Sequence, residues 1–168
     1  KYVKAIINKE DYNFQSVTTG HELSGNLNYY RRVITAYYNA AITNIHKGFT
    51  TAVKDALHQR KIDADIYILK CDGGTLPLNQ SLQTPIKTVN SGPAASIMGS
   101  LVLNQSSKTG IVIDIGGTTS DLGFINNNFP RESSMAVQIG GVRTNFRMPD
   151  LVTIGLGGGT VIKKENGE

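Results

Sequence analysis

The chain has 168 residues and a mass of 18.2 kDa, the size of one compact domain or of one lobe of a larger enzyme. Its 17 Lys and Arg against 13 Asp and Glu give a net charge of +4, but the basic residues are scattered and form no nucleic-acid-binding block. The single cysteine, Cys71, excludes an internal disulfide, and no apolar stretch is long enough to cross a bilayer. We therefore expect a cytoplasmic protein, and the missing initiator Met predicts a piece truncated at both ends.

The first half of the chain predicts two helices and two strands. Apolar residues at 2–7 predict the end of a short helix, and the β-branched run 14–19 predicts a strand. Between Leu27 and Ala56 apolar residues recur at steps of three and four, which predicts one long amphipathic helix. We expect its tyrosines in the core and an interface: Tyr29, Tyr30, Tyr37 and Tyr38. The apolar run 65–70 predicts a strand buried on both faces.

The second half alternates strands with a helix, which predicts α/β architecture. Pro93 marks the first turn of a helix that reaches Leu103. The run 111–115 predicts another strand buried on both faces, followed by a strand at 122–125. Weaker patterns at 134–139 and at 161–162 are further candidate strands.

The histidines and the cysteine favour structural roles. His21 fits a capping or packed residue, and His46 and His58 lie on helix faces where we expect surface positions. Cys71 ends a predicted strand next to Lys70, but nothing around it suggests a nucleophile, so we expect a buried inert thiol.

The most informative stretch is Asp114-Ile-Gly-Gly-Thr-Thr-Ser-Asp121. A strand, two glycines with hydroxyl residues and a returning strand predict a tight hairpin whose backbone N–H groups can face an anion. An ordinary β-hairpin is the alternative, because Gly-Gly turns are common. Asp114 argues against it, since a carboxylate at the end of an apolar strand is costly unless it is paired, hydrogen-bonded or near a cation. A Mg²⁺ held with nucleotide phosphates would satisfy Asp114.

A second glycine-rich stretch is Thr153-Ile-Gly-Leu-Gly-Gly-Gly-Thr160. Three consecutive glycines remove side chains from a turn, as is needed where a flat ligand lies against the backbone. By itself the stretch is more typical of a flexible loop or a tight turn than of a nucleotide site. Neither a dinucleotide fingerprint nor a Walker loop occurs in the chain.

Taken in order, the stretches 91–96, 114–121 and 155–159 resemble the actin, sugar kinase and Hsp70 class of ATPases. A closer resemblance is to the ATP-dependent hydantoinase/5-oxoprolinase family, A-type subunit, which includes subunits of acetone and acetophenone carboxylases. The matching pieces span about 15–160: His21-Glu-Leu-Ser24, Asp72-Gly-Gly74, Ser91-Gly-Pro-Ala94, Asp114-Ile-Gly-Gly-Thr118 with Asp121, and Thr153-Ile-Gly155 with Gly157-Gly-Gly-Thr160. Two departures are Val152, where the family usually has a His, and Lys70-Cys71-Asp72, where it usually has Gln or Asn types.

The resemblance implies a ribonuclease H-like, actin-like lobe with a mixed sheet flanked by helices. Residues 1–168 would be the second ATPase lobe of a longer chain. It further implies ATP and Mg²⁺, a small cyclic amide or ketone as substrate, and a second hydantoinase-type subunit or domain as partner, with no nucleic acid and no membrane. The implied reaction is hydrolysis of a cyclic amide C–N bond after ATP activates the carbonyl. The alternatives are a ketone carboxylase subunit, a non-catalytic nucleotide-binding assembly module, and a divergent piece without a ligand.

The resemblance also assigns roles to residues of the motifs. Asp114 and Asp121 would be catalytic, with Mg²⁺ held by Asp114 through water. The other assignments are phosphate binding by Gly116, Gly117, Thr118 and Thr119, adenosine binding by Gly155, Gly157, Gly158 and Gly159, and a hinge between lobes at Gly92, Ala94 and Ala95.

Overall fold

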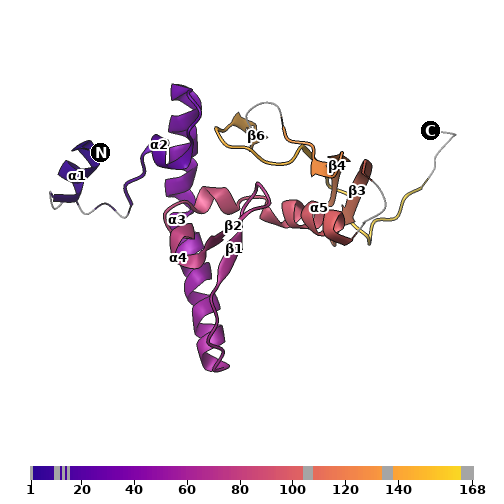
Figure 1. The fold of residues 1–168 in the computed structure, drawn as a ribbon, viewed down its shortest axis with the longest axis horizontal. Coiled ribbons are helices and arrows are strands. Elements are labelled where there is room, and N and C mark those ends of the chain that lie inside the picture. Colours follow the sequence, from indigo (N-terminus) through magenta and orange to yellow (C-terminus); the bar gives the residue numbers. More distant parts are fainter. Residues whose placement is uncertain are drawn as a thin grey trace.

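A computed structural model describes residues 2–9, 12, 14, 16–103, 108–133 and 138–163. One long helix and a small sheet lie at opposite sides of the molecule, and a second helix runs between them (Figure 1). In chain order the elements are α1 (Tyr2–Lys9), α2 (Gly20–Leu23), α3 (Tyr29–Gln59), β1 (Tyr67–Leu69), β2 (Thr75–Pro77), α4 (Leu78–Ser81), the 3₁₀ helix η1 (Pro85–Thr88), α5 (Ser91–Leu103), β3 (Gly110–Ile115), β4 (Ser120–Asn126), β5 (Phe129–Pro130), β6 (Gln138–Ile139), β7 (Val142–Arg143) and β8 (Leu151–Ile154).

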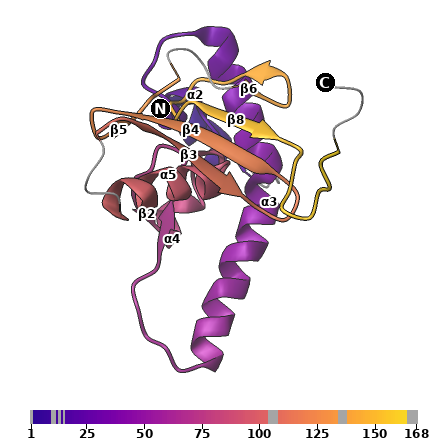
Figure 2. The ribbon, with the colours of Figure 1, turned by 90° about the vertical axis from the view of Figure 1, so that its right-hand side faces the viewer.

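The central sheet is built around β4. It pairs with β3 along its whole length, with β8 on its other side, and with β5 near its end (Figure 2). Every pairing among the described strands is antiparallel. The α/β class is thus confirmed, but the mixed sheet is wrong for the described strands. Short turns join β3 to β4 and β4 to β5, and only a long crossover can make such neighbours parallel.

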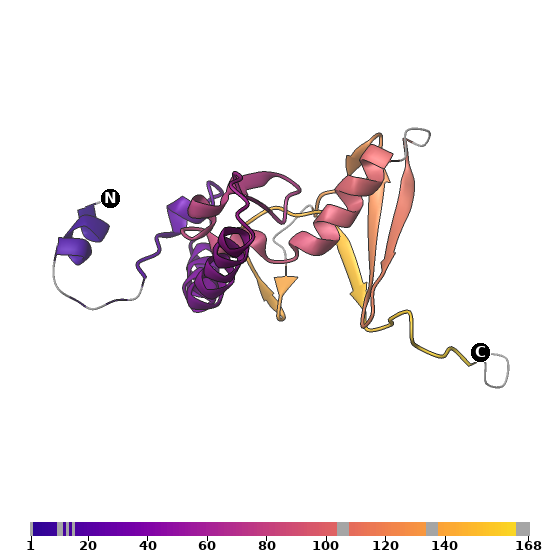
Figure 3. The same cartoon turned by 90° about the horizontal axis from the view of Figure 1, so that it is seen from below.

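Helix α5 packs on one face of this sheet (Figure 3). The contact is close because Gly123 has no side chain: a Cβ there would overlap the side chain of Ile97. On the strand β3, Ile111, Ile113 and Ile115 are 62%, 58% and 63% exposed. The prediction that this strand is buried on both faces is therefore wrong, since α5 covers one face only. The prediction that 65–70 is a strand buried on both faces is also wrong, because among the described strands β1 pairs only with β2, and Tyr67 is exposed.

The predicted long helix is confirmed as α3, but its buried face is polar. Thr35, Asn39, His46 and Thr50 are buried, whereas Tyr29, Tyr30 and Tyr37 are 86%, 64% and 67% exposed. The prediction of a core position is therefore wrong for these three tyrosines. Tyr38 is half-buried, and its hydroxyl donates to the carbonyl oxygen of Ile139 at 3.4 Å.

The polar face of α3 is explained by what packs against it. Asn39 accepts from the Ile86 N–H at 3.1 Å and donates to the Gln83 carbonyl oxygen at 3.3 Å. Thr35 Oγ1 accepts from the Asn145 N–H at 2.9 Å. Gln83 lies in a turn, Ile86 in the 3₁₀ helix η1 and Asn145 in a bend. Backbone groups of turns and of the first turn of a helix lack partners within the element and need side-chain partners when they are buried. The packing of these short segments against α3 therefore selects the polar stripe.

Other predicted elements are partly corrected. The helix at the start of the chain is confirmed as α1, and the helix after Pro93 as α5, which already begins at Ser91. No strand forms at residues 14 and 16–19, nor at 161–162. Of the candidate strand 134–139, residues 134–137 lie outside the described residues, and 138–139 form β6. The strand β8 was not predicted. No helix in the described ranges is long and apolar enough to span a membrane.

Candidate nucleotide site

Three polar side chains form a row across one face of the sheet. Asp114 on β3 is the direct cross-strand partner of Asp121 on β4, and Asp121 is in turn the partner of Thr153 on β8. Directly opposed residues of an antiparallel sheet point to the same face. The two carboxylates predicted to be catalytic are therefore neighbours, although six residues separate them in sequence.

Each carboxylate of this row is positioned by one hydroxyl group. Ser96 Oγ of α5 donates to Asp114 Oδ2 at 2.5 Å, and Thr153 Oγ1 donates to Asp121 Oδ1 at 2.5 Å. The other oxygen of each carboxylate has no hydrogen bond within the described part of the chain. Each Asp is thus held in place by one oxygen and can bind a ligand with the other.

The donor hydroxyls were not predicted as site residues. Ser96 lies in the stretch 91–96, and Thr153 is the first residue of the glycine-rich stretch. Both therefore belong to motifs of the sequence analysis. A serine on a helix that packs over an acidic strand end is the signal that could have found Ser96. For Thr153 the pairing of β8 with β4 was needed, which short-range patterns do not reveal.

The hairpin and the glycine-rich loop, separated in sequence, are joined in the structure. The Gly158 N–H donates to the Gly116 carbonyl oxygen at 2.9 Å, and Ser120 Oγ donates to the Leu156 carbonyl oxygen at 2.5 Å. Gly157 lies so close to Gly117 that a Cβ at residue 157 would overlap the carbonyl oxygen of Gly117. The two stretches form one backbone surface at the end of the sheet, next to the carboxylate row.

Some of the predicted phosphate donors are already used. The Gly116 N–H donates to the Thr119 carbonyl oxygen at 2.8 Å inside the hairpin. The N–H groups of Gly117 and Thr118, at the tip, have no partner within the described ranges. Successive backbone N–H groups in such a turn bind anionic oxygens. The tip is therefore the part of the hairpin that can accept a phosphate.

The residues present fit a water-mediated Mg²⁺ rather than a protein cage. No group of three or more potential metal ligands occurs among the described residues. Mg²⁺ usually keeps several waters and is bound by one or two carboxylates together with substrate phosphates. The free oxygens of Asp114 and Asp121 match that donor set.

The small residues at the start of α5 are only partly open. Ala94 is fully buried, while Gly92 and Ala95 are exposed. Nothing lies within 4 Å of a Cβ at Gly92 or at Gly99. The open part of this helix, which we call the small-residue face, consists of Gly92, Ala95 and Gly99.

The Asp72-Gly-Gly74 piece forms a turn against α5. Asp72 Oδ1 accepts from the Gly74 N–H at 2.9 Å, and its Oδ2 pairs with Lys70 Nζ at 2.8 Å. Burial alone would raise the pKa of Asp72, but the hydrogen bonds from Lys70 and Gly74 outweigh it and lower the pKa. Gly73 has a φ of +82°, and a Cβ there would clash with Met98. This turn is a packing element in the described structure.

The histidine predictions are corrected in part. His46 is buried, not at the surface, and its Nε2 lies 2.7 Å from Ser81 Oγ, which donates to the Leu78 carbonyl oxygen. His58 is exposed as predicted. His21 is also exposed, and the prediction of a capping or packed histidine is wrong, because α2 has no side-chain cap and the N-cap of α3 is Asn28. Cys71 is 2% exposed, and burial raises the pKa of its thiol to about 11. The expected buried, inert thiol is confirmed.

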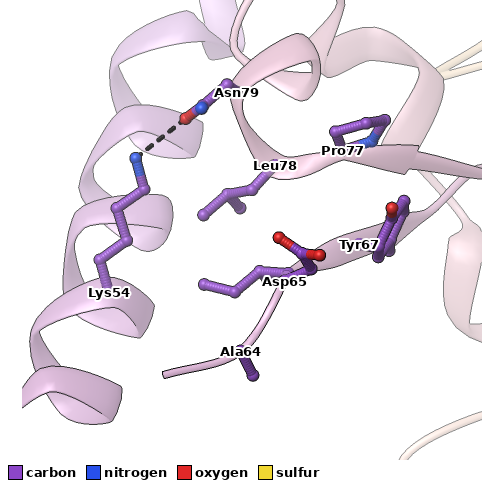
Figure 4. A pocket seen from close by; sticks show the side chains of 8 residues that line it. Lys54, Ala64, Asp65, Tyr67, Pro77, Leu78 and Asn79 are labelled. Carbon is purple, nitrogen blue, oxygen red and sulfur yellow. Dashed lines mark hydrogen bonds between the residues drawn. The ribbon is translucent and has the colours of Figure 1, made fainter. Parts of the chain in front are cut away.

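The structure has a cavity that lies away from the carboxylate row and another that lies beside it. One of 240 Å³ lies between α3 and β1, with Lys54, Asp65 and Tyr67 among its lining residues, and contains none of the predicted site residues (Figure 4). Another, of 620 Å³, is lined by Thr153 together with residues of the segment 138–151. This second cavity adjoins the carboxylate row, whereas the first does not.

Comparison with known proteins agrees with the motifs. A family model described as hydantoinase/oxoprolinase matches residues 32–168. An uncharacterised protein of Methanocaldococcus jannaschii is 26% identical over 170 residues, covering 90% of this chain and 24% of the relative. The acetophenone carboxylase gamma subunit of Aromatoleum aromaticum is 26% identical over 170 residues, covering 97% of this chain and 23% of that subunit.

A solved structure shares the fold. The nucleotide-free structure of acetone carboxylase, described as an enzyme of ATP-dependent acetone carboxylation, superposes with a TM-score of 0.72 at 18% identity. The match covers 88% of this chain and 21% of that one. The chain therefore spans about a quarter of the length of the relatives it matches.

Proposed function

Because the chain belongs to the hydantoinase/oxoprolinase family, we propose that it forms one lobe of an ATP-dependent enzyme. The enzyme transfers a phosphoryl group from ATP to the carbonyl oxygen of a small organic substrate. The observation that carries this proposal is the contact between the hairpin and the glycine-rich loop. The N–H groups at the hairpin tip lie near Asp114 and Asp121, and each of these carboxylates has one oxygen without a hydrogen bond to a described residue. The shared fold with acetone carboxylase, which is described as an enzyme of ATP-dependent acetone carboxylation, supports the use of ATP.

The roles of the residues follow from what phosphoryl transfer requires. The bond between the γ-phosphorus and its bridging oxygen breaks, a new bond forms to the carbonyl oxygen, and ADP leaves. Catalysis of this step is mainly alignment and neutralisation of charge. The Gly117 and Thr118 N–H groups bind phosphate oxygens, and the loop from Gly155 to Gly159 supports the adenosine.

The two carboxylates act beside this phosphate site. A bound Mg²⁺ supplies positive charge that neutralises the transferred group. Asp114 would hold the hydrated ion, since Ser96 donates to its Oδ2 and leaves Oδ1 available. Asp121, held by Thr153, orients the water or the substrate next to the phosphate.

Two overall reactions remain as candidates. Hydrolysis of a cyclic amide is the reaction that we infer from the motifs, since phosphorylation of the carbonyl makes the C–N bond easier to cleave. Carboxylation of a ketone is the second candidate, and the names of two matched proteins favour it: acetophenone carboxylase and acetone carboxylase. In both reactions a second subunit or domain completes the substrate site. One relative is itself named as a subunit.

A turnover assay with the full-length protein tests the proposal. ADP formation is measured with Mg-ATP alone, with hydantoin or 5-oxoproline, and with acetophenone plus bicarbonate. We expect one of the organic substrates to stimulate ADP formation, and the substrate that does so identifies the reaction. The 168-residue chain alone should show no turnover, because one lobe supplies part of the contacts and no enclosure.

The outcomes of this assay separate the alternatives. Mg-ATP binding without stimulation by any substrate would favour a nucleotide-binding assembly module. If the full-length protein binds no Mg-ATP at all, the proposed function is wrong. Nucleotide binding is measured separately, by calorimetry, so that these two results are distinct.

A further inference from the structure

The cavity of 620 Å³ beside the carboxylate row has a chemical character of its own. It lies between the start of α5, the β6–β7 hairpin and the strand β8, and its lining includes Asn90, Arg143, Met148 and Thr153. Its size is in the range of pockets that hold small molecules, about 300–1,000 Å³. Thr153 is the residue that it shares with the carboxylate row, and residues 116–119 and 155–159 do not line it. The cavity therefore adjoins the nucleotide site without coinciding with it.

The charge in this cavity is positive. Asp150, which also lines it, is paired with Arg131 at 3.3 Å. The side chain of Arg143, which is exposed, has no ion pair or hydrogen bond to another described residue. A guanidinium has five donors in a planar fork that fits a carboxylate or a similar oxyanion. Arg143 therefore favours an anionic ligand.

Part of the cavity wall is apolar. Met148 is buried, and Leu151 packs against the cluster of Met148 and Cys71. Met148 and Leu151 also line the cavity. Such a wall favours the hydrocarbon part of a ligand by removing apolar surface from water. The ligand that fits both features has a charged oxygen at one end and an apolar body.

Thr153 connects this cavity to the candidate site. Its side chain lines the cavity, and its hydroxyl donates to Asp121. A molecule in the cavity therefore lies next to the residue that holds the Asp121 carboxylate. The cavity between α3 and β1 includes no residue of the carboxylate row.

We propose that this cavity is the binding site for the acceptor substrate, a small organic anion whose charge is bound by Arg143. The apolar part of the anion packs on Met148 and Leu151, and its other end points toward Thr153 and Asp121. The proposal rests on the proposed function, because it names the substrate class of that same site. Arg143 is then a specificity-determining residue for the negative charge.

The test uses benzoate as the probe and benzamide as its neutral match, since they differ in charge but little in shape. Binding to the full-length protein is measured by calorimetry for the natural chain and for Arg143→Gln, Arg143→Lys and Arg147→Gln. Arg147 is a matched control, because it is an exposed arginine on the same segment, it is paired with Glu132 and it does not line the cavity.

We expect the natural chain to bind benzoate at least about 10-fold more tightly than benzamide, as one charge-assisted hydrogen bond provides. Arg143→Gln should abolish this preference, Arg143→Lys should keep part of it, and Arg147→Gln should leave it unchanged. Equal affinity for the two probes in the natural chain, or a preference that survives Arg143→Gln, overturns the proposal. So does a natural chain that binds neither probe.

Binding of Mg-ATP is measured on the same four proteins. We expect it to be unchanged in every variant, which also shows that the variants are folded. A protein that prefers benzoate through Arg143 but binds no Mg-ATP would contradict the proposed function and leave the anion site in place. A protein that binds Mg-ATP without an Arg143-dependent preference for benzoate would contradict the anion site alone.

Discussion

Gly157 lies directly against the carbonyl oxygen of Gly117, so that any side chain at residue 157 would overlap it. This contact joins the tip of the hairpin to the glycine-rich loop, and the hydrogen bond from Gly158 to Gly116 reinforces it. The glycines of the loop therefore have different roles. Gly157 is required for close approach, whereas a Cβ at Gly159 would meet nothing within 4 Å.

The first prediction follows from this difference. Gly157→Ala should lower the free energy of unfolding by about 1–3 kcal/mol, the usual cost of overpacking, and should weaken Mg-ATP binding because the loop is displaced from the hairpin. Gly159→Ala is the matched control and should change both quantities little. Thermal unfolding of the full-length protein, with and without Mg-ATP, measures them. Equal effects of the two substitutions would mean that the contact between loop and hairpin does not matter.

The second prediction concerns Asp114. Asp114→Asn in the full-length protein should reduce turnover at least ~100-fold, because it removes the negative charge that would hold Mg²⁺, and the ion's positive charge is what stabilises the transferred group. The fold should be unchanged, since the Asn side-chain oxygen can still accept from Ser96. Ser96→Ala should have a milder effect, because it keeps the charge and loses only the positioning bond. Steady-state ADP formation is the measurement, with Asp63→Asn as an exposed control, and near-normal turnover of Asp114→Asn would remove this residue from the mechanism.

The third prediction concerns the small-residue face of α5, which we propose as the hinge between lobes. Closure requires elements that can slide past each other without interlocked side chains. Ala95→Leu in the full-length protein should therefore raise the KM for ATP more than it lowers the Tm. Ala40→Leu, at an exposed position of α3, is the matched control. A lower Tm with an unchanged KM would show that this face is ordinary core in the complete protein.

The fourth prediction concerns the pH dependence of stability. Burial lowers the pKa of His46, so the folded state binds a proton less readily than the unfolded state. The contribution of the neutral ring is complete above the unfolded value, about 6.5, and it is lost as the pH falls through the lower folded pKa. His46→Gln should flatten the fall of the Tm below pH ~6.5, whereas His58→Gln, at an exposed position, should not. An unchanged pH profile in His46→Gln would assign the acid sensitivity to other groups.

The glycine motifs could be interpreted from the sequence because their meaning is local. Two apolar runs that flank a Gly-Gly pair predict a tight turn wherever the chain lies in space, and the order of the stretches identified the family. The long helix α3 was predicted for the same reason, since its periodicity depends on neighbours three and four residues apart. The turn and helix positions were therefore determined by the sequence itself.

Only the tertiary structure decided which residues meet. The pairing of β8 with β4 places Thr153 beside Asp121 across 32 residues of sequence, and no short-range pattern contains that register. Helix α3 buries Asn39 and exposes Tyr37, because the turn at Gln83 and the start of η1 pack on its polar side and hydrogen-bond to Asn39. Which face of an element is buried depends on the chemistry of its neighbours in space, and hydrophobic periodicity assumes that those neighbours are apolar. Where they are backbone groups of turns and of a helix end, the polar stripe is buried instead.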